Sequence, residues 1–105
     1  MKAVITADLI ESTQYRKSLL EKVLTALNQE FINLGLKSNE EYQFYRGDSF
    51  QLITTASKAL NIALRLKSLV IKTGTPANLR LAIGIGKIEY PAKKIAEANG
   101  EAFRD

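Results

Sequence analysis

The stretch that decides the fold lies near the middle of the chain, at Glu41–Thr54, and reads EYQFYRGDSFQLIT. Its two arms are rich in aromatic and β-branched residues, and Gly47-Asp48 between them is a dipeptide typical of tight turns. The stretch therefore predicts a β-hairpin. How this hairpin joins a larger sheet depends on the segments before and after it.

Upstream of the hairpin, a strand and a long helix are expected. Residues 2–10 are alternating and β-branched, which favours a strand. Ser12 or Thr13 then offers an N-cap for a helix over 14–34, and Gly35 offers the residue that closes it. Apolar residues recur at every third or fourth position of this helix and predict one buried face.

Downstream of the hairpin, a second helix and a fourth strand are expected. The helix is predicted over 56–72, with one apolar stripe and a set of residues that widen it. The stripe comprises Leu60, Ala63, Leu64, Lys67 and Ile71, and the widening set comprises Ile62, Leu66, Leu69 and Val70. Residues 79–88 alternate as a strand, and residues 91–105 begin as a helix that breaks at Asn99-Gly100.

The resulting order, β-α-β-β-α-β, predicts an α+β fold of the ferredoxin-like type. In that fold an antiparallel sheet in the order 4-1-3-2 carries both helices on one face, because right-handed crossovers leave few alternatives. The end of the first strand, with Asp8, then lies beside the hairpin turn, with Asp48. The topology therefore brings two carboxylates to one edge of the sheet.

Composition bounds what such a site could do. A chain of 105 residues with 46% hydrophobic and 25% charged residues is typical of one soluble globular domain, and no apolar run could span a bilayer. The absence of cysteine and histidine excludes thiolate chemistry, imidazole metal ligands and a Ser-His-Asp triad. With no export signal, the cytoplasm is the expected compartment.

The net charge of +4 is spread along the chain. We interpret it mainly as a solvated surface, with an anionic ligand or partner as the less favoured alternative. No basic run with interleaved aromatic residues is present, so DNA binding by this segment is not supported.

Asp8 and Asp48 are the candidate metal ligands, and Mg²⁺ is the candidate ion, since paired carboxylates are its usual protein ligands. The alternatives are a solvent-facing or helix-capping role for Asp8 and ordinary turn chemistry for Asp48. Glu11, Ser12 and Thr13 precede the long helix, where free amides could bind a phosphate, although N-capping by Ser12 or Thr13 is the favoured interpretation. With Gly47 they form the candidate ligand-binding set.

Three segments together resemble the class III nucleotidyl cyclase and diguanylate cyclase superfamily. They are ITADLIEST at 5–13, RGDSF at 46–50, which resembles the GGDEF signature, and RLAIGIG at 80–86. With NGEAF at 99–103, the ordered set is similar to SatD-like bacterial proteins. The resemblance implies that Asp8 and Asp48 bind metal and that the Ile10 carbonyl is a third ligand.

The chain also departs from the family pattern. Glu11 stands where cyclases favour glycine in the triphosphate loop, and Ser49 replaces the glutamate of GGDEF. Ala102 and Arg104 do not align with the groups that steady the transition state in cyclases. We therefore expect residues 1–105 to be a single domain, a fragment of a longer protein, that is catalytically degenerate; whether it is an enzyme stays open.

Three hypotheses of function follow. The first is a regulatory or ligand-sensing domain that binds a nucleotide and Mg²⁺. The second is an active metal-dependent nucleotidyl cyclase or nucleotidyltransferase that works as a homodimer. The third is a structural or dimerisation module of a transcription regulator.

Overall fold

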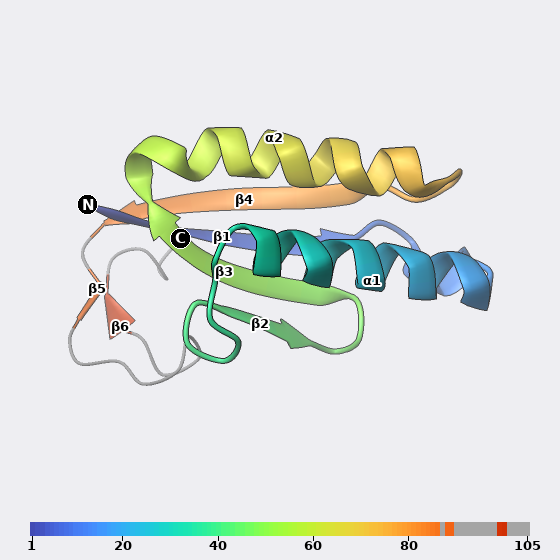
Figure 1. Ribbon diagram of the computed structural model, residues 1–105, viewed down its shortest axis with the longest axis horizontal. Coiled ribbons are helices and arrows are strands. Elements are labelled where there is room, and N and C mark those ends of the chain that lie inside the picture. The colour runs from blue at the N-terminus through green and yellow to red at the C-terminus, as the bar shows by residue number, and fades with distance from the viewer. Residues whose placement is uncertain (87, 90–98, 101–105) are drawn as a thin grey trace.

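The computed structural model describes residues 1–86, 88–89 and 99–100 and shows the predicted sequence of elements (Figure 1). After the first strand, a short 3-10 helix at Ser12–Gln14 precedes the first long helix. The strands are β1 (Lys2–Leu9), β2 (Tyr42–Tyr45), β3 (Ser49–Thr55), β4 (Leu79–Gly86), β5 (Ile88–Glu89) and β6 (Asn99–Gly100), and the helices are α1 (Lys17–Asn33) and α2 (Ala56–Thr73).

The main sheet has four antiparallel strands in the order β2-β3-β1-β4, and both helices cover the same face (Figure 1). This is the predicted order, 4-1-3-2, counted from the other edge, so the ferredoxin-like prediction is confirmed. β1 occupies a central position, with Asp8 opposite Ser49 on β3 and opposite Arg80 on β4. β5 and β6 form a separate two-stranded pair.

The core lies between the sheet and the helices. Alternate residues of β1 face the helices, and all four of these are buried, namely Ala3, Ile5, Ala7 and Leu9. Phe31 of α1 is fully buried and packs against three aromatic rings of the hairpin, at centroid distances of 4.7 Å to Tyr42, 5.6 Å to Phe44 and 5.1 Å to Phe50. The aromatic residues therefore belong to the core and hold α1 on the hairpin.

The predicted start of the long helix is wrong. α1 begins at Lys17, and neither Ser12 nor Thr13 caps it, because Arg16 is the capping residue and makes no side-chain hydrogen bond. Tyr15 has an extended backbone, with φ −76° and ψ 143°, which separates the short 3-10 helix from α1. The helix is delayed because Ser12 bonds to the hairpin turn and Tyr15 bonds to the residue before β4.

The predicted end of that helix is confirmed. Gly35 has φ +76°, and its N–H donates to the carbonyl of Ile32, while the N–H of Leu36 donates to the carbonyl of Phe31. These two bonds form a Schellman motif, which satisfies carbonyls that the helix end would otherwise leave without partners.

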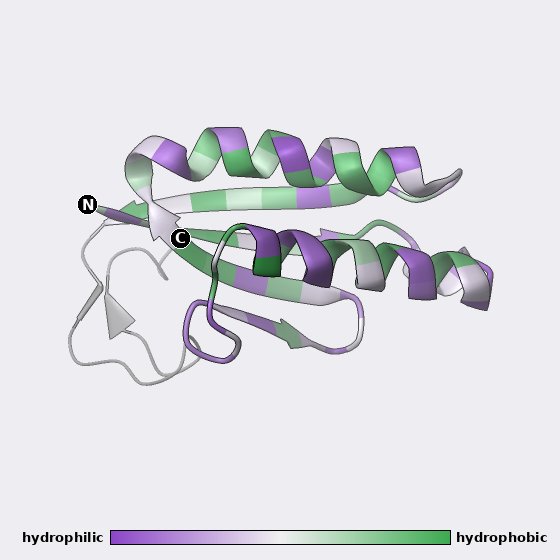
Figure 2. Cartoon of the chain, in the orientation of Figure 1, coloured by the Kyte–Doolittle hydropathy of each residue, from purple (hydrophilic) through white to green (hydrophobic). Residues whose placement is uncertain are grey.

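The predicted apolar stripe of α2 is wrong at three of its positions. Leu60, Leu64 and Ile71 are exposed, whereas the buried residues of α2 are Ala59, Ile62, Ala63, Leu66 and Val70. Three of the residues that were expected only to widen the stripe, Ile62, Leu66 and Val70, thus form much of the buried face of α2. Hydropathic colouring shows green segments of α2 turned away from the sheet as well as toward it (Figure 2).

The last predicted strand ends earlier than expected. β4 ends at Gly86, two residues before the predicted end, and Ile88 belongs to β5. The helix predicted from residue 91 lies outside the described residues. Within the described part of the chain, neither helix combines the length and the apolar character that crossing a bilayer requires.

Candidate functional site

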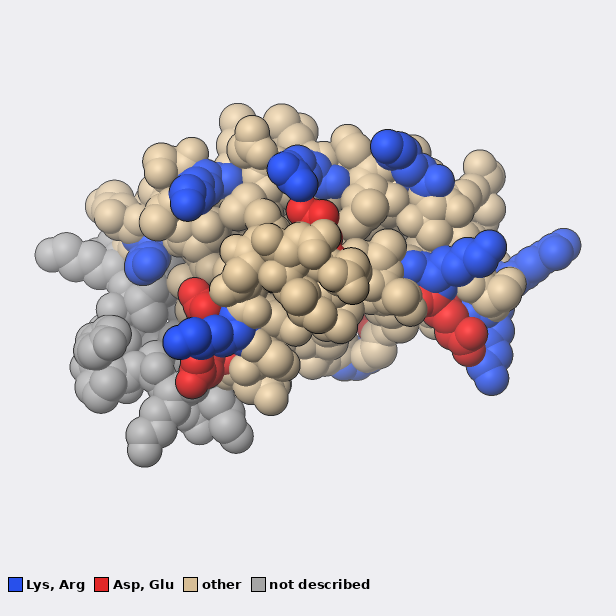
Figure 3. All heavy atoms as spheres, viewed as in Figure 1, with Lys and Arg blue, Asp and Glu red and all other residues tan. Residues whose placement is uncertain are grey.

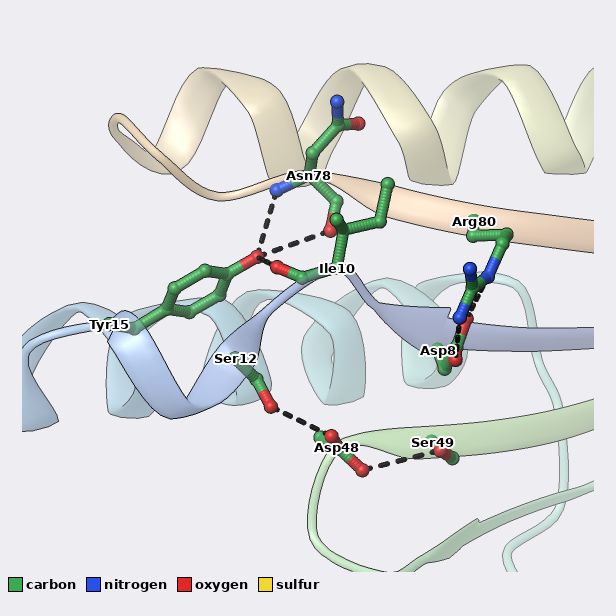
Figure 4. A network of polar contacts seen from close by, with 8 residues as sticks. All are labelled: Asp8, Ile10, Ser12, Tyr15, Asp48, Ser49, Asn78 and Arg80. Atoms are coloured by element: carbon green, nitrogen blue, oxygen red, sulfur yellow. Dashed lines mark hydrogen bonds and ion pairs between the residues drawn. The ribbon is translucent and has the colours of Figure 1, made fainter.

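The sheet brings Asp8 and Asp48 to the same end of the fold, as the topology predicted. Asp8 lies opposite Ser49, the residue that follows Asp48, and the N–H of Leu9 donates to the carbonyl of Asp48 at 2.9 Å. β1 therefore ends beside the turn of the hairpin. The side chains of the two aspartates nevertheless have different partners (Figure 4).

Asp8 forms a two-point ion pair with Arg80 of β4. Arg80 donates from Nε to Oδ1 at 3.0 Å and from a terminal nitrogen to Oδ2 at 2.8 Å. The hydrogen bonds from Arg80 lower the pKa of Asp8 below its usual 3.8, against a smaller opposing effect of burial. The pair is open to water, with 37% of the Asp8 side chain and 71% of the Arg80 side chain exposed, so dissolved ions can screen it.

Asp48 is held by two hydroxyl groups. Ser12 donates to its Oδ2 at 2.7 Å, and Ser49 donates to its Oδ1 at 3.3 Å. Hydroxyl donors that orient a carboxylate in this way also leave lone pairs of both oxygens free for a cation. Ser12 therefore positions Asp48 and does not cap a helix.

The segment after β1 is fixed to the start of β4 through Tyr15, whose ring is buried. The Tyr15 hydroxyl lies 2.8 Å from the carbonyl oxygen of Ile10, to which it donates, and accepts from the N–H of Asn78 at 3.0 Å. The N–H of Ile10 in turn donates to the carbonyl of Asn78 at 3.0 Å. The Ile10 carbonyl, which the cyclase resemblance implies as a metal ligand, is thus already one partner of Tyr15 (Figure 4).

A cavity of about 370 Å³ lies beside the ion pair, at the end of the sheet. Its lining includes Asp8, Arg80, Ser49, Tyr45 and Arg46. The cavity therefore combines one carboxylate, two guanidinium groups, the hydroxyls of Thr6 and Ser49, and the phenol ring of Tyr45.

The hairpin turn brings Arg46 into this lining. Arg46 and Gly47 both have positive φ values, 54° and 76°, which is common for glycine and uncommon for arginine. The Arg46 guanidinium lies 5.1 Å from the centre of the Tyr45 ring, a cation–π contact. The turn and the ring together fix a positive charge beside the cavity.

The other candidate ligand-binding residues are divided by the structure. Ser12 contacts Asp48 directly, and Gly47 belongs to the same turn as Asp48. Glu11 and Thr13 are exposed, and Glu11 has the left-handed φ of 52° that starts the short 3-10 helix. None of these four residues, nor Asp48, belongs to the lining of the cavity beside Asp8, and Gly47 lines a different cavity next to α1.

Sequence reasoning missed the roles of Arg80, Tyr15 and Asn78. The predicted topology brings Arg80 to the same end of the sheet as Asp8, because the fourth strand starts beside the end of the first, but it does not fix the register that makes the two residues partners. Tyr15 and Asn78 could not have been found, since 63 positions separate them and no local pattern links them.

The number of carboxylate ligands at this end of the sheet limits how a cation could bind. In the described part of the chain, no group of three or more acidic, histidine or cysteine side chains could hold a metal ion. Two carboxylates that meet phosphate oxygens and water are, however, a usual ligand set for Mg²⁺. Both Asp8 oxygens accept hydrogen bonds from Arg80, so this carboxylate can bind a Mg²⁺ ion only after Arg80 moves away.

Charges elsewhere are dispersed. On the face seen in Figure 3, basic side chains are spaced along α2 and gathered near one end of α1, and acidic side chains lie among them. The aromatic rings that pack on Phe31 lie in the core, where they are not available to stack on bases. The cavity beside Asp8 is the candidate site because its lining includes a carboxylate that the sequence predicts as a metal ligand.

The fold defines the chain as a small α+β protein of the ferredoxin-like type. Comparison with protein families, with curated proteins and with solved structures finds no match. The functional assignment therefore rests on the geometry of the site.

Proposed function

We propose that this chain is a ligand-sensing domain of nucleotidyl-cyclase-like fold that binds a nucleotide together with Mg²⁺ in the cavity beside Asp8. The observation that carries the proposal is the lining of that cavity, in which Asp8 supplies a carboxylate and Arg46 and Arg80 supply two cations. Asp48 does not line the cavity, but its carboxylate accepts a hydrogen bond from the lining residue Ser49. Guanidinium groups bind phosphate through paired hydrogen bonds, and carboxylates bind the accompanying metal ion.

The size and chemistry of the cavity support a nucleotide. Its volume of about 370 Å³ is at the lower end of the range for small-molecule sites. The Tyr45 ring offers a flat apolar surface for a base or a ribose, and the hydroxyl of Ser49 offers a hydrogen bond. The charged groups in the lining favour a charged ligand over an apolar one.

The ion pair between Asp8 and Arg80 favours a domain that binds a nucleotide over one that converts it to a product. A Mg²⁺ ion held by Asp8 and Asp48 would neutralise part of the negative charge of the nucleotide's phosphate groups. Arg80 donates both of its hydrogen bonds to Asp8, the carboxylate that the cyclase resemblance implies as a metal ligand. We therefore infer that Arg80 must move from Asp8 to the phosphate when the ligand enters, a rearrangement suited to a sensor.

Isothermal titration with Mg²⁺ and ATP or GTP tests this function. The parent protein is expected to bind the Mg²⁺–nucleotide complex, and Asp8→Asn and Asp48→Asn are expected to weaken binding at least tenfold, since each removes a carboxylate charge. Glu30→Gln is the matched control because Glu30 also pairs with an arginine, Arg65, at 2.9 Å but lies away from the cavity.

Two results would contradict the proposal. One is the absence of binding to the parent protein at millimolar nucleotide with Mg²⁺ present. The other is equal affinity in the parent and in both aspartate variants, which would mean that the nucleotide binds elsewhere. Release of cyclic nucleotide or pyrophosphate by the parent would favour the enzyme hypothesis in place of the sensor.

A further inference from the structure

Among the residues that the structure describes, β4 is an edge strand of the main sheet with no partner on its outer side. It is eight residues long, and among the described residues its only partner strand is β1. Monomeric proteins usually shield such an edge with lysine, proline, a bulge or a covering segment. The sequence of β4, LRLAIGIG, contains no proline, lysine or acidic residue.

The apolar side chains of this edge are exposed on the side of the sheet that carries the helices. Ile83 and Ile85 share a face with Leu79 and Leu81, yet they are 38% and 53% exposed. α2 covers the sheet next to them without burying them. A long edge strand with exposed isoleucines is a predicted site of association.

The exposed residues of α2 continue this apolar surface. Leu60, Leu64 and Ile71 share one stripe of the helix with Lys67, since their spacing is that of a single helical face. Lys67 donates from Nζ to the carbonyl of Leu79 at 2.7 Å, so the stripe borders β4.

Because α2 runs antiparallel to β4, its exposed stripe follows the length of that edge strand. α2 starts where β1 starts, since the N–H of Ala56 donates to the carbonyl of Met1, and Gly86 lies opposite Lys2. The helix therefore runs antiparallel to β4, and its first turns lie over the end that carries Ile83 and Ile85 (Figure 1). We call the surface formed by Leu60, Ile71, Ile83 and Ile85 the β4 flank, and leave out Leu64 because it lines a cavity shared with Glu30 of α1.

Among the described residues, the two charged side chains at this edge, Arg80 and Lys67, have partners within the chain. Arg80, the only charged residue of β4, is paired with Asp8, and the amine of Lys67 is turned inward to Asn78 and Leu79. A second positively charged copy could therefore approach this side without placing unpaired like charges together.

We propose that the β4 flank is a two-fold interface at which a second copy of this chain pairs its β4 antiparallel to the first. The occupant must offer a free strand edge and, on the same side of that strand, an apolar helix stripe. A copy of the chain offers both, and a two-fold axis aligns identical edges antiparallel by symmetry. The pairing joins two four-stranded sheets into one continuous sheet with all the helices on one side.

Sedimentation velocity of the whole chain tests the interface. The parent is expected to change from 11.7 kDa to twice that mass as its concentration rises to about 0.5 mM, a range that reveals a micromolar Kd. Ile85→Lys and Leu60→Lys are expected to stay monomeric. Ile32→Lys is the matched control, because Ile32 is 54% exposed but lies on α1.

A second experiment does not depend on the lysine variants. The parent contains no cysteine, so single cysteines introduced one at a time from Leu81 to Ile85 can form disulfides only between copies. Oxidation is expected to cross-link most strongly at the position nearest the two-fold axis, and Ile32→Cys is expected to remain uncross-linked. Circular dichroism of each variant checks that the fold is retained.

The proposal is overturned by any of several results. The parent could stay monomeric over the whole concentration range, or it could dimerise equally well with Ile85→Lys. Open-ended oligomers in place of dimers, or an absence of cross-linking at all five β4 positions, would also exclude a closed two-fold pairing of β4.

Discussion

Replacing Tyr15 by phenylalanine is expected to destabilise the protein by more than the loss of one ordinary hydrogen bond. The hydroxyl donates to the Ile10 carbonyl at 2.8 Å and accepts from the Asn78 N–H at 3.0 Å, and the residue is only 8% exposed. Each bond contributes about 1 kcal/mol net, so Tyr15→Phe is expected to cost about 2 kcal/mol. In a domain of this size, that loss lowers Tm by about 10 °C.

Tyr42→Phe is the matched control for this prediction. Tyr42 is similarly buried, at 6% exposed, but its hydroxyl makes one hydrogen bond, at 3.1 Å to Oδ1 of Asn28. Its loss is expected to cost about 1 kcal/mol. Urea unfolding followed by circular dichroism gives both values, since a change of midpoint at constant slope reports stability.

The comparison of the two tyrosine variants can refute the reasoning. If Tyr15→Phe loses no more stability than Tyr42→Phe, the Tyr15 hydroxyl does not fix the segment after β1 to the start of β4. The start of α1 at Lys17 would then need another cause, because the long-range bonds of Tyr15 would be too weak to delay the helix.

Two further predictions concern Arg80 and α2. Hydrogen bonds from Arg80 lower the pKa of Asp8, so this pKa is lower in the folded protein than in the unfolded chain. The stability that the pair contributes is therefore present above pH 3.8 and is lost as the pH falls through the pKa of the folded protein. In Arg80→Gln the Asp8 pKa measured by carboxyl NMR titration is expected to rise toward 3.8, and an unchanged value would show that the pair does not form in solution. Leu66→Ala removes a fully buried side chain and is expected to cost about 3 kcal/mol, whereas Leu64→Ala, at 59% exposed, is expected to cost about 0.5 kcal/mol or less in the monomer at low concentration. Equal losses in thermal unfolding would contradict the assignment of buried and exposed faces of α2.

Much of the fold could be predicted from local patterns. The hairpin around Gly47 and the helix end at Gly35 depend on the backbone freedom of glycine, and the positions of glycines can be read directly from the sequence. The pairing of strands followed from the order of elements, because few right-handed arrangements are possible. The same topology was enough to bring Asp8 and Asp48 to one end of the sheet.

The errors share a cause. The periodicity of α2 indicated that the helix is amphipathic, but it did not indicate which of two neighbouring stripes faces the sheet. That choice depends on how α1 and β4 flank the helix, and Lys67 reaches β4 in a way that leaves Leu60 and Leu64 outside. Likewise, Ser12 is a good helix cap by type, but its hydroxyl instead binds a carboxylate from the hairpin turn.

The sequence by itself determined the element order, the antiparallel sheet and the approach of the two aspartates, since these follow from periodicity, turn chemistry and chain handedness. Only the tertiary structure decided that Asp8 pairs with Arg80, that Asp48 pairs with Ser12, and that β4 carries an exposed apolar flank. These contacts join residues that are distant along the chain, and their geometry depends on the packing of whole elements. Side-chain partners of that kind have no local signal, and so they appear only once the chain has folded.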